Sequence, residues 1–102
     1  MISQDQQSVI ISKLSSLAPK KIGIFGSYAR NENQKSSDLD ILSFLDPASK
    51  ISLLKLIKAE QDLANSLGIK VDLITERSLN PLVRPFVEKD LKIIFGQRGE
   101  TV

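Results

Sequence analysis

Three aspartates are the residues whose types and spacing could support chemistry. Asp38 and Asp40 are separated by one leucine at the start of an apolar run, and Asp72 lies inside a later apolar run. Residues i and i+2 of a strand face the same side with Cα atoms about 6.5–7 Å apart, so these two carboxylates would repel unless a cation lay between them. A divalent ion at about 2.0–2.1 Å from each oxygen bridges such a gap. Three carboxylates from two neighbouring strands would form the protein part of a two-metal site, an arrangement used for phosphoryl or nucleotidyl transfer.

Each of these carboxylates also has an ordinary structural explanation. Pairs of aspartates two residues apart are common at solvated strand edges and in turn caps, because such short motifs are not specific. A charge such as Asp72 on an edge strand discourages aggregation. Against this, an acidic residue flanked by apolar ones in a strand is poorly placed unless its side chain faces a partner or a cleft.

The composition limits which other chemistry the chain can perform. It contains neither cysteine nor histidine, which excludes a disulfide framework, a thiolate zinc site and a Ser-His-Asp triad. Asp and Glu must therefore carry any acid–base or metal chemistry, and hard cations such as Mg²⁺ or Mn²⁺ suit these ligands. The net charge of +2 is too small by itself to indicate binding to nucleic acid.

The length of 102 residues indicates one domain that spans residues 1–102. The hydrophobic content of 41% and the charged content of 25% are ordinary for globular proteins. The N-terminal stretch MISQDQQSVIISKL lacks a basic n-region, and no apolar run approaches the length of a membrane span. We therefore expect a soluble, cytoplasmic protein with no membrane partner.

Hydrophobic periodicity predicts alternating helices and strands that would position the aspartates. The expected helices are 6–17, one or two turns from 27 to about 31, 46–67 and 80–90; the expected strands are 21–25, 38–45, 69–75 and 91–95. This order predicts an α/β (α+β) class with a small mixed β-sheet flanked by helices. The long helical connection before residue 69 permits a parallel strand pair, and the loop 31–37 is short enough for an antiparallel one.

Several helix ends have explicit signals. Asp46-Pro47 predicts a helix start, with Asp as the N-cap and Pro at the first helical position. Gly68 predicts the C-terminal cap of the same helix. Asn80-Pro81 predicts the start of the last helix, which Pro85 should shorten or bend.

The Gly26-Ser27 pair at the end of the first strand could hold a phosphate group. Glycine lets backbone N–H groups approach a ligand closely, the serine hydroxyl adds a donor, and the start of a helical turn favours negative charge. The alternative is an ordinary strand-to-helix turn. The combination with three carboxylates favours a nucleotide, because phosphate needs hydrogen-bond donors and its metal ions need oxygen ligands.

The stretch GSYARNENQKSSDLD, residues 26–40, resembles the nucleotidyltransferase superfamily that includes DNA polymerase beta and kanamycin nucleotidyltransferase. The shared pattern is Gly-Ser, ten residues, Asp-x-Asp and an Asp in a later strand, and the likeness extends over about 20–75. The short length and the wording GSYAR…SDLDIL are most similar to the minimal nucleotidyltransferases, or MNT proteins, which are antitoxin partners of HEPN toxins. Family members commonly have glycine where this chain has Asn31, and asparagine tolerates the left-handed conformation that this turn would need.

The resemblance implies that Gly26 and Ser27 hold the triphosphate of the incoming nucleotide. Arg30 would reach a phosphate oxygen, although a solvated charge is the alternative. For Tyr28, a packing role is favoured over stacking on the nucleotide.

The resemblance also implies that Asp38, Asp40 and Asp72 are the catalytic and metal-binding residues. Asp38 and Asp40 would bind both of two Mg²⁺ ions, with Mn²⁺ as a possible substitute. Asp72 would complete the second metal site and help to activate the attacking hydroxyl.

The implied reaction is transfer of AMP from ATP to a tyrosine hydroxyl of a cognate HEPN toxin ribonuclease, which is thereby neutralised. The protein would form a hetero-oligomer with that toxin and make no direct contact with nucleic acid. Two alternatives stay open: an antitoxin that acts by binding and occlusion alone, and a nucleotidyltransferase that modifies a small molecule. The tripeptide Arg84-Pro85-Phe86 is the candidate for a protein contact.

Overall fold

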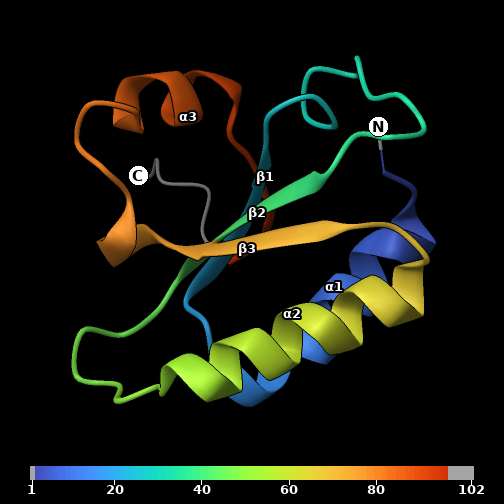
Figure 1. Cartoon of the computed structure of the whole chain (residues 1–102). Coiled ribbons are helices and arrows are strands. Elements are labelled where there is room, and N and C mark those ends of the chain that lie inside the picture. Colours follow the sequence, from blue (N-terminus) through green and yellow to red (C-terminus); the bar gives the residue numbers. More distant parts are fainter. Residues whose placement is uncertain (1, 97–102) are drawn as a thin grey trace.

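The structure is a computed structural model that describes residues 2–96, and in these residues a four-stranded sheet has helices on both faces (Figure 1). In chain order the elements are α1 (Gln4–Leu14), η1 (Ser15–Leu17), β1 (Lys21–Phe25), β2 (Leu39–Phe44), α2 (Leu53–Leu67), β3 (Val71–Thr75), η2 (Glu76–Ser78), α3 (Arg84–Asp90) and β4 (Lys92–Phe95), where η marks a 3₁₀ turn. The predicted α/β class with a small sheet flanked by helices is confirmed.

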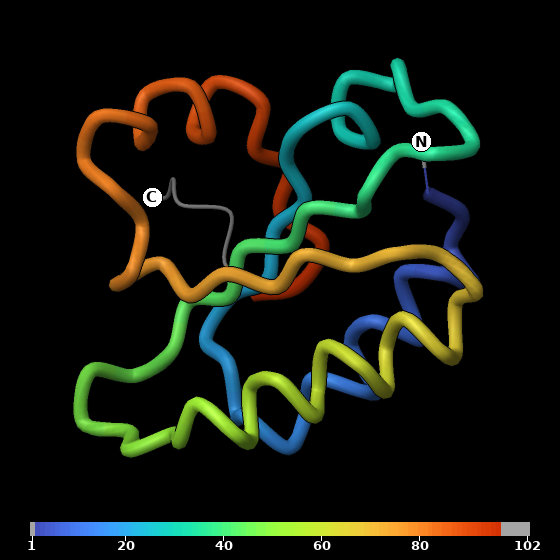
Figure 2. The backbone as a smooth tube through the Cα atoms, viewed as in Figure 1, coloured from blue at the N-terminus to red at the C-terminus, as the bar shows by residue number. Residues whose placement is uncertain are grey.

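The strand directions bring several chain segments to one end of the sheet. The strand order is β3-β2-β1-β4, with β1 antiparallel to both β2 and β4, and β2 parallel to β3. The end of β1 therefore lies beside the beginnings of β2, β3 and β4. Figure 2 shows the loop between β1 and β2, in cyan and teal, extending from this end of the sheet.

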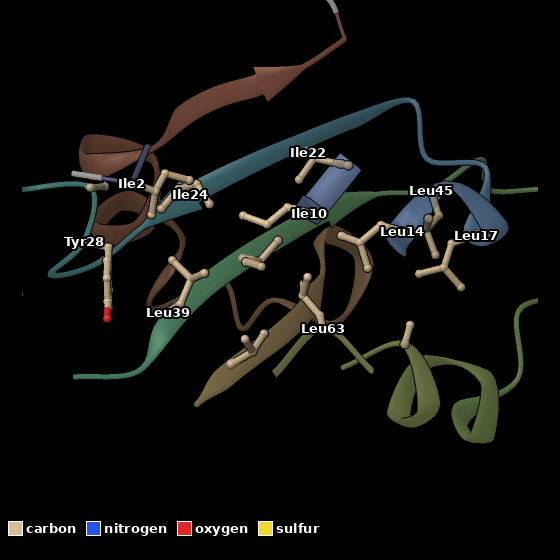
Figure 3. Close-up of a cluster of buried hydrophobic side chains, with 14 residues drawn as sticks. Ile2, Ile10, Leu14, Leu17, Ile22, Ile24, Tyr28, Leu39, Leu45 and Leu63 are labelled. Carbon is tan, nitrogen blue, oxygen red and sulfur yellow. The ribbon is translucent and has the colours of Figure 1, made fainter. Parts of the chain in front are cut away.

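The two faces of the sheet bury different side chains. α1 and α2 lie on one face, and α3 lies on the other (Figure 1). Side chains that are fully buried between the sheet and the first two helices include Ile10, Leu14, Leu17, Ile22, Leu39, Ile41 and Leu63 (Figure 3). Each such aliphatic side chain contributes about 1.5–3 kcal/mol on burial, so this layer is the main core.

Alternation along β2 decides which of its side chains face α3. Leu39 and Ile41 belong to the core under α1 and α2, whereas Leu42 packs with residues of the α3 side. Successive residues of a strand face opposite sides, so Asp40 shares the α3 face with Leu42.

The predicted helix start at Asp46-Pro47 is wrong. α2 begins at Leu53, where the Ser52 hydroxyl accepts a hydrogen bond from the Lys55 backbone N–H at 3.1 Å. The Asp46 side chain instead accepts from the Ala48 N–H at 2.8 Å. Aspartate followed by proline suits a tight turn as well as a helix start. Here the Asp46 carboxylate accepts from the backbone N–H two residues later and stabilises a turn.

The other helix ends differ less from expectation. Gly68 ends α2 in the left-handed conformation (φ +69°), as predicted. The first helix becomes a 3₁₀ turn from Ser15, and the last one begins at Arg84 after a turn at Asn80. Pro85 lies in the first turn of α3, where its missing N–H costs no helical hydrogen bond, so it begins this helix without bending it. None of the helices found in residues 2–96 has both the length and the apolar character needed to span a bilayer.

Candidate active site

The turn after β1 begins at a glycine that no other residue could replace without strain. Gly26 has φ +75°, a left-handed conformation that side chains disfavour. A Cβ atom added at Gly26 would also overlap Oδ2 of Asp40, which lies against this part of the backbone. Because Gly26 has no side chain, its backbone and the Asp40 carboxylate of β2 can come into contact. The two halves of the predicted site are in direct contact.

The segment that follows forms a single turn, the shorter of the two lengths that the sequence allowed. The backbone N–H groups of Arg30 and Glu32 donate to Gly26 O at 3.0 Å and Ser27 O at 2.8 Å. Asn31 takes the left-handed conformation (φ +60°) that its position requires. Within residues 2–96, the backbone N–H groups of residues 27–29 donate no backbone hydrogen bond in this turn. These N–H groups lie at the start of the turn, where a ligand oxygen can accept from them.

The acidic residues come from adjacent strands. Asp40 of β2 and Asp72 of β3 are direct partners in the parallel register. Asp40 is half-buried, whereas Asp72 is exposed. Asp38 precedes β2 by one residue and shares the parity of Asp40, so all three are placed toward the α3 side of the sheet.

Burial and repulsion both act on Asp40. Loss of solvent contact, followed by the negative charges of Asp72 and then Asp38, raises the pKa of its carboxyl from 3.8 to about 6. Arg30 opposes the shift. A carboxylate in this state gains from a nearby cation, because the cation favours its charged form.

The carboxylates are not already arranged as a finished metal site. No group of three or more His, Cys, Asp or Glu side chains among residues 2–96 is placed to hold an ion as it stands. The predicted convergence of three carboxylates is therefore only partial, with Asp40 and Asp72 paired in register and Asp38 just outside the strand. The donor set still fits a hard divalent cation, because it offers only carboxylate oxygens whose charges repel one another.

A pocket of about 360 Å³ opens between this turn and α3. Its polar lining comes from Gly26, Arg30, Asp40 and Asp90. The apolar wall consists of Phe25, Ile74, Leu79, Val83, Phe86 and Val87. This volume lies in the range of about 300–1,000 Å³ that small ligands occupy. A larger hollow of about 490 Å³ lies on the α1 side, but its lining has no carboxylate, so we place the site in the smaller pocket.

Arg30 is held in the pocket by two carboxylates. Its Nη1 donates to Asp90 Oδ2 at 2.6 Å, and its Nε donates to Glu32 Oε1 at 3.0 Å. The hydrogen bonds with Glu32 and Asp90 raise the pKa of Arg30 above its ordinary value. The guanidinium is therefore cationic at the mouth of the pocket.

Comparison with known proteins now identifies the chain. The family model described as a nucleotidyltransferase domain matches residues 6–94. The chain belongs to the nucleotidyltransferase domain family. The predicted family and the predicted enzyme class are both confirmed.

Two curated relatives of this nucleotidyltransferase are protein adenylyltransferases by name. A predicted protein adenylyltransferase of Methanocaldococcus jannaschii is 56% identical over 73 residues, which cover 71% of this chain and 72% of that protein. Protein adenylyltransferase MntA of Thermococcus cleftensis is 47% identical over 60 residues, 59% of each chain.

Two solved structures are similar to this nucleotidyltransferase over most of its length. One is a toxin–antitoxin with AMP-PNP, with a TM-score of 0.78 and 29% identity over 90% of this chain and 74% of that chain. The other is tri-AMPylated Shewanella oneidensis HEPN toxin in complex with MNT antitoxin, with a TM-score of 0.74 and 27% identity over 95% of this chain and 75% of that chain.

Sequence reasoning missed the contribution of α3 to the nucleotidyltransferase pocket. The pocket residues Leu79, Val83, Phe86, Val87 and Asp90 recur at the spacing of one helix face, which was a usable signal. That spacing could not show which part of the sheet the face would cover. Tyr28, in contrast, is buried in the core under α1, as its favoured packing role predicted (Figure 3).

Proposed function

We propose that this nucleotidyltransferase transfers AMP from ATP to a tyrosine hydroxyl of a HEPN toxin and neutralises the toxin in this way. The observation that carries the proposal is the position of Asp40. The Asp40 carboxylate packs against Gly26. In the parallel register of β2 and β3, Asp40 is the direct partner of Asp72. Gly26, where the turn would bind phosphate, and Asp40, which would bind metal with Asp72, line the same pocket. Relatives named as adenylyltransferases, and a similar antitoxin bound to an AMPylated toxin, support this choice of donor and acceptor.

The turn residues would bind the triphosphate. The N–H groups at residues 27–29 and the Ser27 hydroxyl would donate to phosphate oxygens, and Gly26 allows their close approach. Arg30 would add a cationic donor within the same pocket.

Asp38, Asp40 and Asp72 would hold two Mg²⁺ ions. When bound, the ions would polarise the α-phosphate and neutralise the charge of the departing pyrophosphate. The residues of the chain then need to position the reactants, which suits a protein without histidine.

The transfer exchanges one phosphorus–oxygen bond for another. The acceptor hydroxyl oxygen bonds to the α-phosphorus, the bond from the α-phosphorus to the bridging oxygen breaks, and pyrophosphate leaves. The hydroxyl proton passes to the exposed carboxylate of Asp72, which can release it to solvent. Asp40 must be ionised for this arrangement, and bound Mg²⁺ would favour its ionised form.

A protein acceptor is favoured over a small molecule by the rim of the pocket. Leu82, Val83 and Phe86 expose 81%, 44% and 72% of their surface, and the latter two also line the pocket. Clustered exposed apolar side chains of this kind mark protein contacts more often than solvent-facing surface. They include Phe86 of the tripeptide that the sequence singled out.

The test is to incubate the protein with labelled ATP, Mg²⁺ and a candidate HEPN toxin, and then to weigh the toxin by mass spectrometry. We expect one or more adenylyl groups on a tyrosine, and none with Asp38→Ala or Asp40→Ala. Asp62→Ala on the exposed face of α2 is the matched control and should retain activity. An unmodified toxin that is nevertheless inhibited would support occlusion, and modification of a small molecule alone would exclude the toxin as the acceptor.

A further inference from the structure

We propose that Asp90 is a positioning residue of the nucleotide site, which holds the Arg30 guanidinium toward the phosphate-binding turn. The inference rests on the proposed function, since it assigns a role within the same pocket. It concerns a residue in α3, outside the Gly-Ser and Asp-x-Asp motifs.

The Arg30–Asp90 pair is the more shielded of the two contacts of Arg30. The Asp90 side chain is only 18% exposed, whereas that of Glu32 is 66% exposed. The distance to Asp90 is also shorter, 2.6 Å against 3.0 Å. Exposed ion pairs are weakened by solvent screening, so Asp90 holds the guanidinium more firmly than Glu32 does.

The fold explains why residues 60 positions apart meet here. Asp90 ends α3 and leads into β4, whose Lys92 pairs with Ile24 of β1. Gly26 and Arg30 follow directly after β1. The register of β1 with β4 therefore brings the end of α3 beside the turn (Figure 1). The Arg30–Asp90 pair joins the turn to the apolar wall of the pocket.

The geometry leaves donors of Arg30 for a ligand. A guanidinium has five N–H groups, and the two contacts use Nη1 and Nε. Within residues 2–96, Nη2 makes no hydrogen bond or ion pair and remains available to a phosphate oxygen. Arg30 and Asp40 line the same pocket, so the charge of Arg30 acts within the site. Without Asp90, the long side chain would spend less time in this orientation.

The experiment measures binding of AMP-PNP with Mg²⁺ by titration calorimetry, and in parallel KM and kcat for ATP in the toxin assay. Asp90→Asn should weaken binding about tenfold, as expected for loss of a charge-assisted hydrogen bond, and should raise KM more than it lowers kcat. Glu32→Gln, the matched control, should change affinity by less than about twofold because solvent screens that pair. Asp90→Glu keeps the charge and should restore part of the affinity.

A double variant distinguishes a positioning role of Asp90 from general support of the fold. If Asp90 acts through Arg30, adding Asp90→Asn to Arg30→Ala should cause no further loss of affinity. Thermal melts of each variant show whether it folds. Equal affinities of wild type and Asp90→Asn, tighter binding by Asp90→Asn, or additive losses in the double variant would each overturn the inference and leave the proposed function standing. If the wild type binds no nucleotide, the proposed function itself fails.

Discussion

Replacing Asp40 by Asn should stabilise the protein at neutral pH in the absence of metal. The pKa of Asp40 is raised from 3.8 to about 6, so the folded state binds this proton more tightly than the unfolded chain does. The stability that the protonated carboxyl allows is complete below about pH 4 and is lost as the pH rises through about 6. Asparagine has nearly the same shape and no charge to lose, so it avoids this penalty.

The expected gain in the free energy of unfolding follows from the shift in the pKa of Asp40. A rise from 3.8 to about 6 is about 2.2 units, which corresponds to about 3 kcal/mol for a fully shielded group at about 1.36 kcal/mol per unit. Asp40 is only half-buried, and solvent screening reduces this to about 1–2 kcal/mol. For a domain of this size, each kcal/mol raises Tm by about 4–8 °C.

The assay is urea unfolding in EDTA over the range from about pH 4 to about pH 7.5. The free energy of unfolding of Asp40→Asn should equal that of wild type at the acid end and exceed it by about 1–2 kcal/mol at the neutral end. Asp62→Asn on α2 is the control and should show no such pH-dependent difference. A variant that is no more stable than wild type at neutral pH, or a difference that does not vary with pH, would refute the reasoning.

Bound Mg²⁺ and nucleotide should make wild type the more stable of the two proteins. With Mg²⁺ and AMP-PNP at neutral pH, we expect the melting temperature of wild type to rise, because ligand binding to the folded state adds stability. Asp40→Asn should show a much smaller rise, since a neutral amide is a weaker ligand for a hard cation. An equal rise in both proteins would show that Asp40 does not bind the ion.

Two further substitutions test the structure around the site. Ser43 is fully buried in β2 and its hydroxyl has no hydrogen-bond partner among residues 2–96, so Ser43→Ala should stabilise the protein by up to about 1 kcal/mol in urea unfolding; a loss of stability would mean that the hydroxyl is satisfied. Gly26→Ala should lower stability by at least about 1–2 kcal/mol from its left-handed conformation alone, with a further loss from overlap with Asp40, and should abolish nucleotide binding in calorimetry. Retention of both properties would show that the Asp40 carboxylate is free to move away.

Local signals predicted those parts of the fold that depend on neighbours in sequence. The strand Lys21–Phe25 lies where its apolar run placed it, and Gly68 ends α2 as a left-handed cap. Asp46-Pro47 shows the limit of this reasoning. Both Asp46 and Ser52 are competent N-caps, and the helix uses the second because the first is taken by a turn.

The same distinction holds for the site. Gly26, Ser27 and the aspartate pair were predicted as site residues from their types and spacing, because those features suit a phosphate and its metal ions. The contact between Gly26 and Asp40 needed the antiparallel pairing of β1 with β2, and the register of Asp40 with Asp72 needed the parallel pairing of β2 with β3. Asp90 was missed because nothing near it in sequence marks it as a partner of Arg30.

By itself the sequence determined the secondary-structure elements, the class of the fold, the family and the residues that could bind phosphate and metal. These depend on the pattern of apolar residues and on motifs in which the interacting groups are close in the chain. Only the tertiary structure decided that α3 forms the wall of the pocket and that its last residue holds Arg30. Strand order and register bring such groups together across 60 residues, and they result from the packing of the whole sheet between its helices.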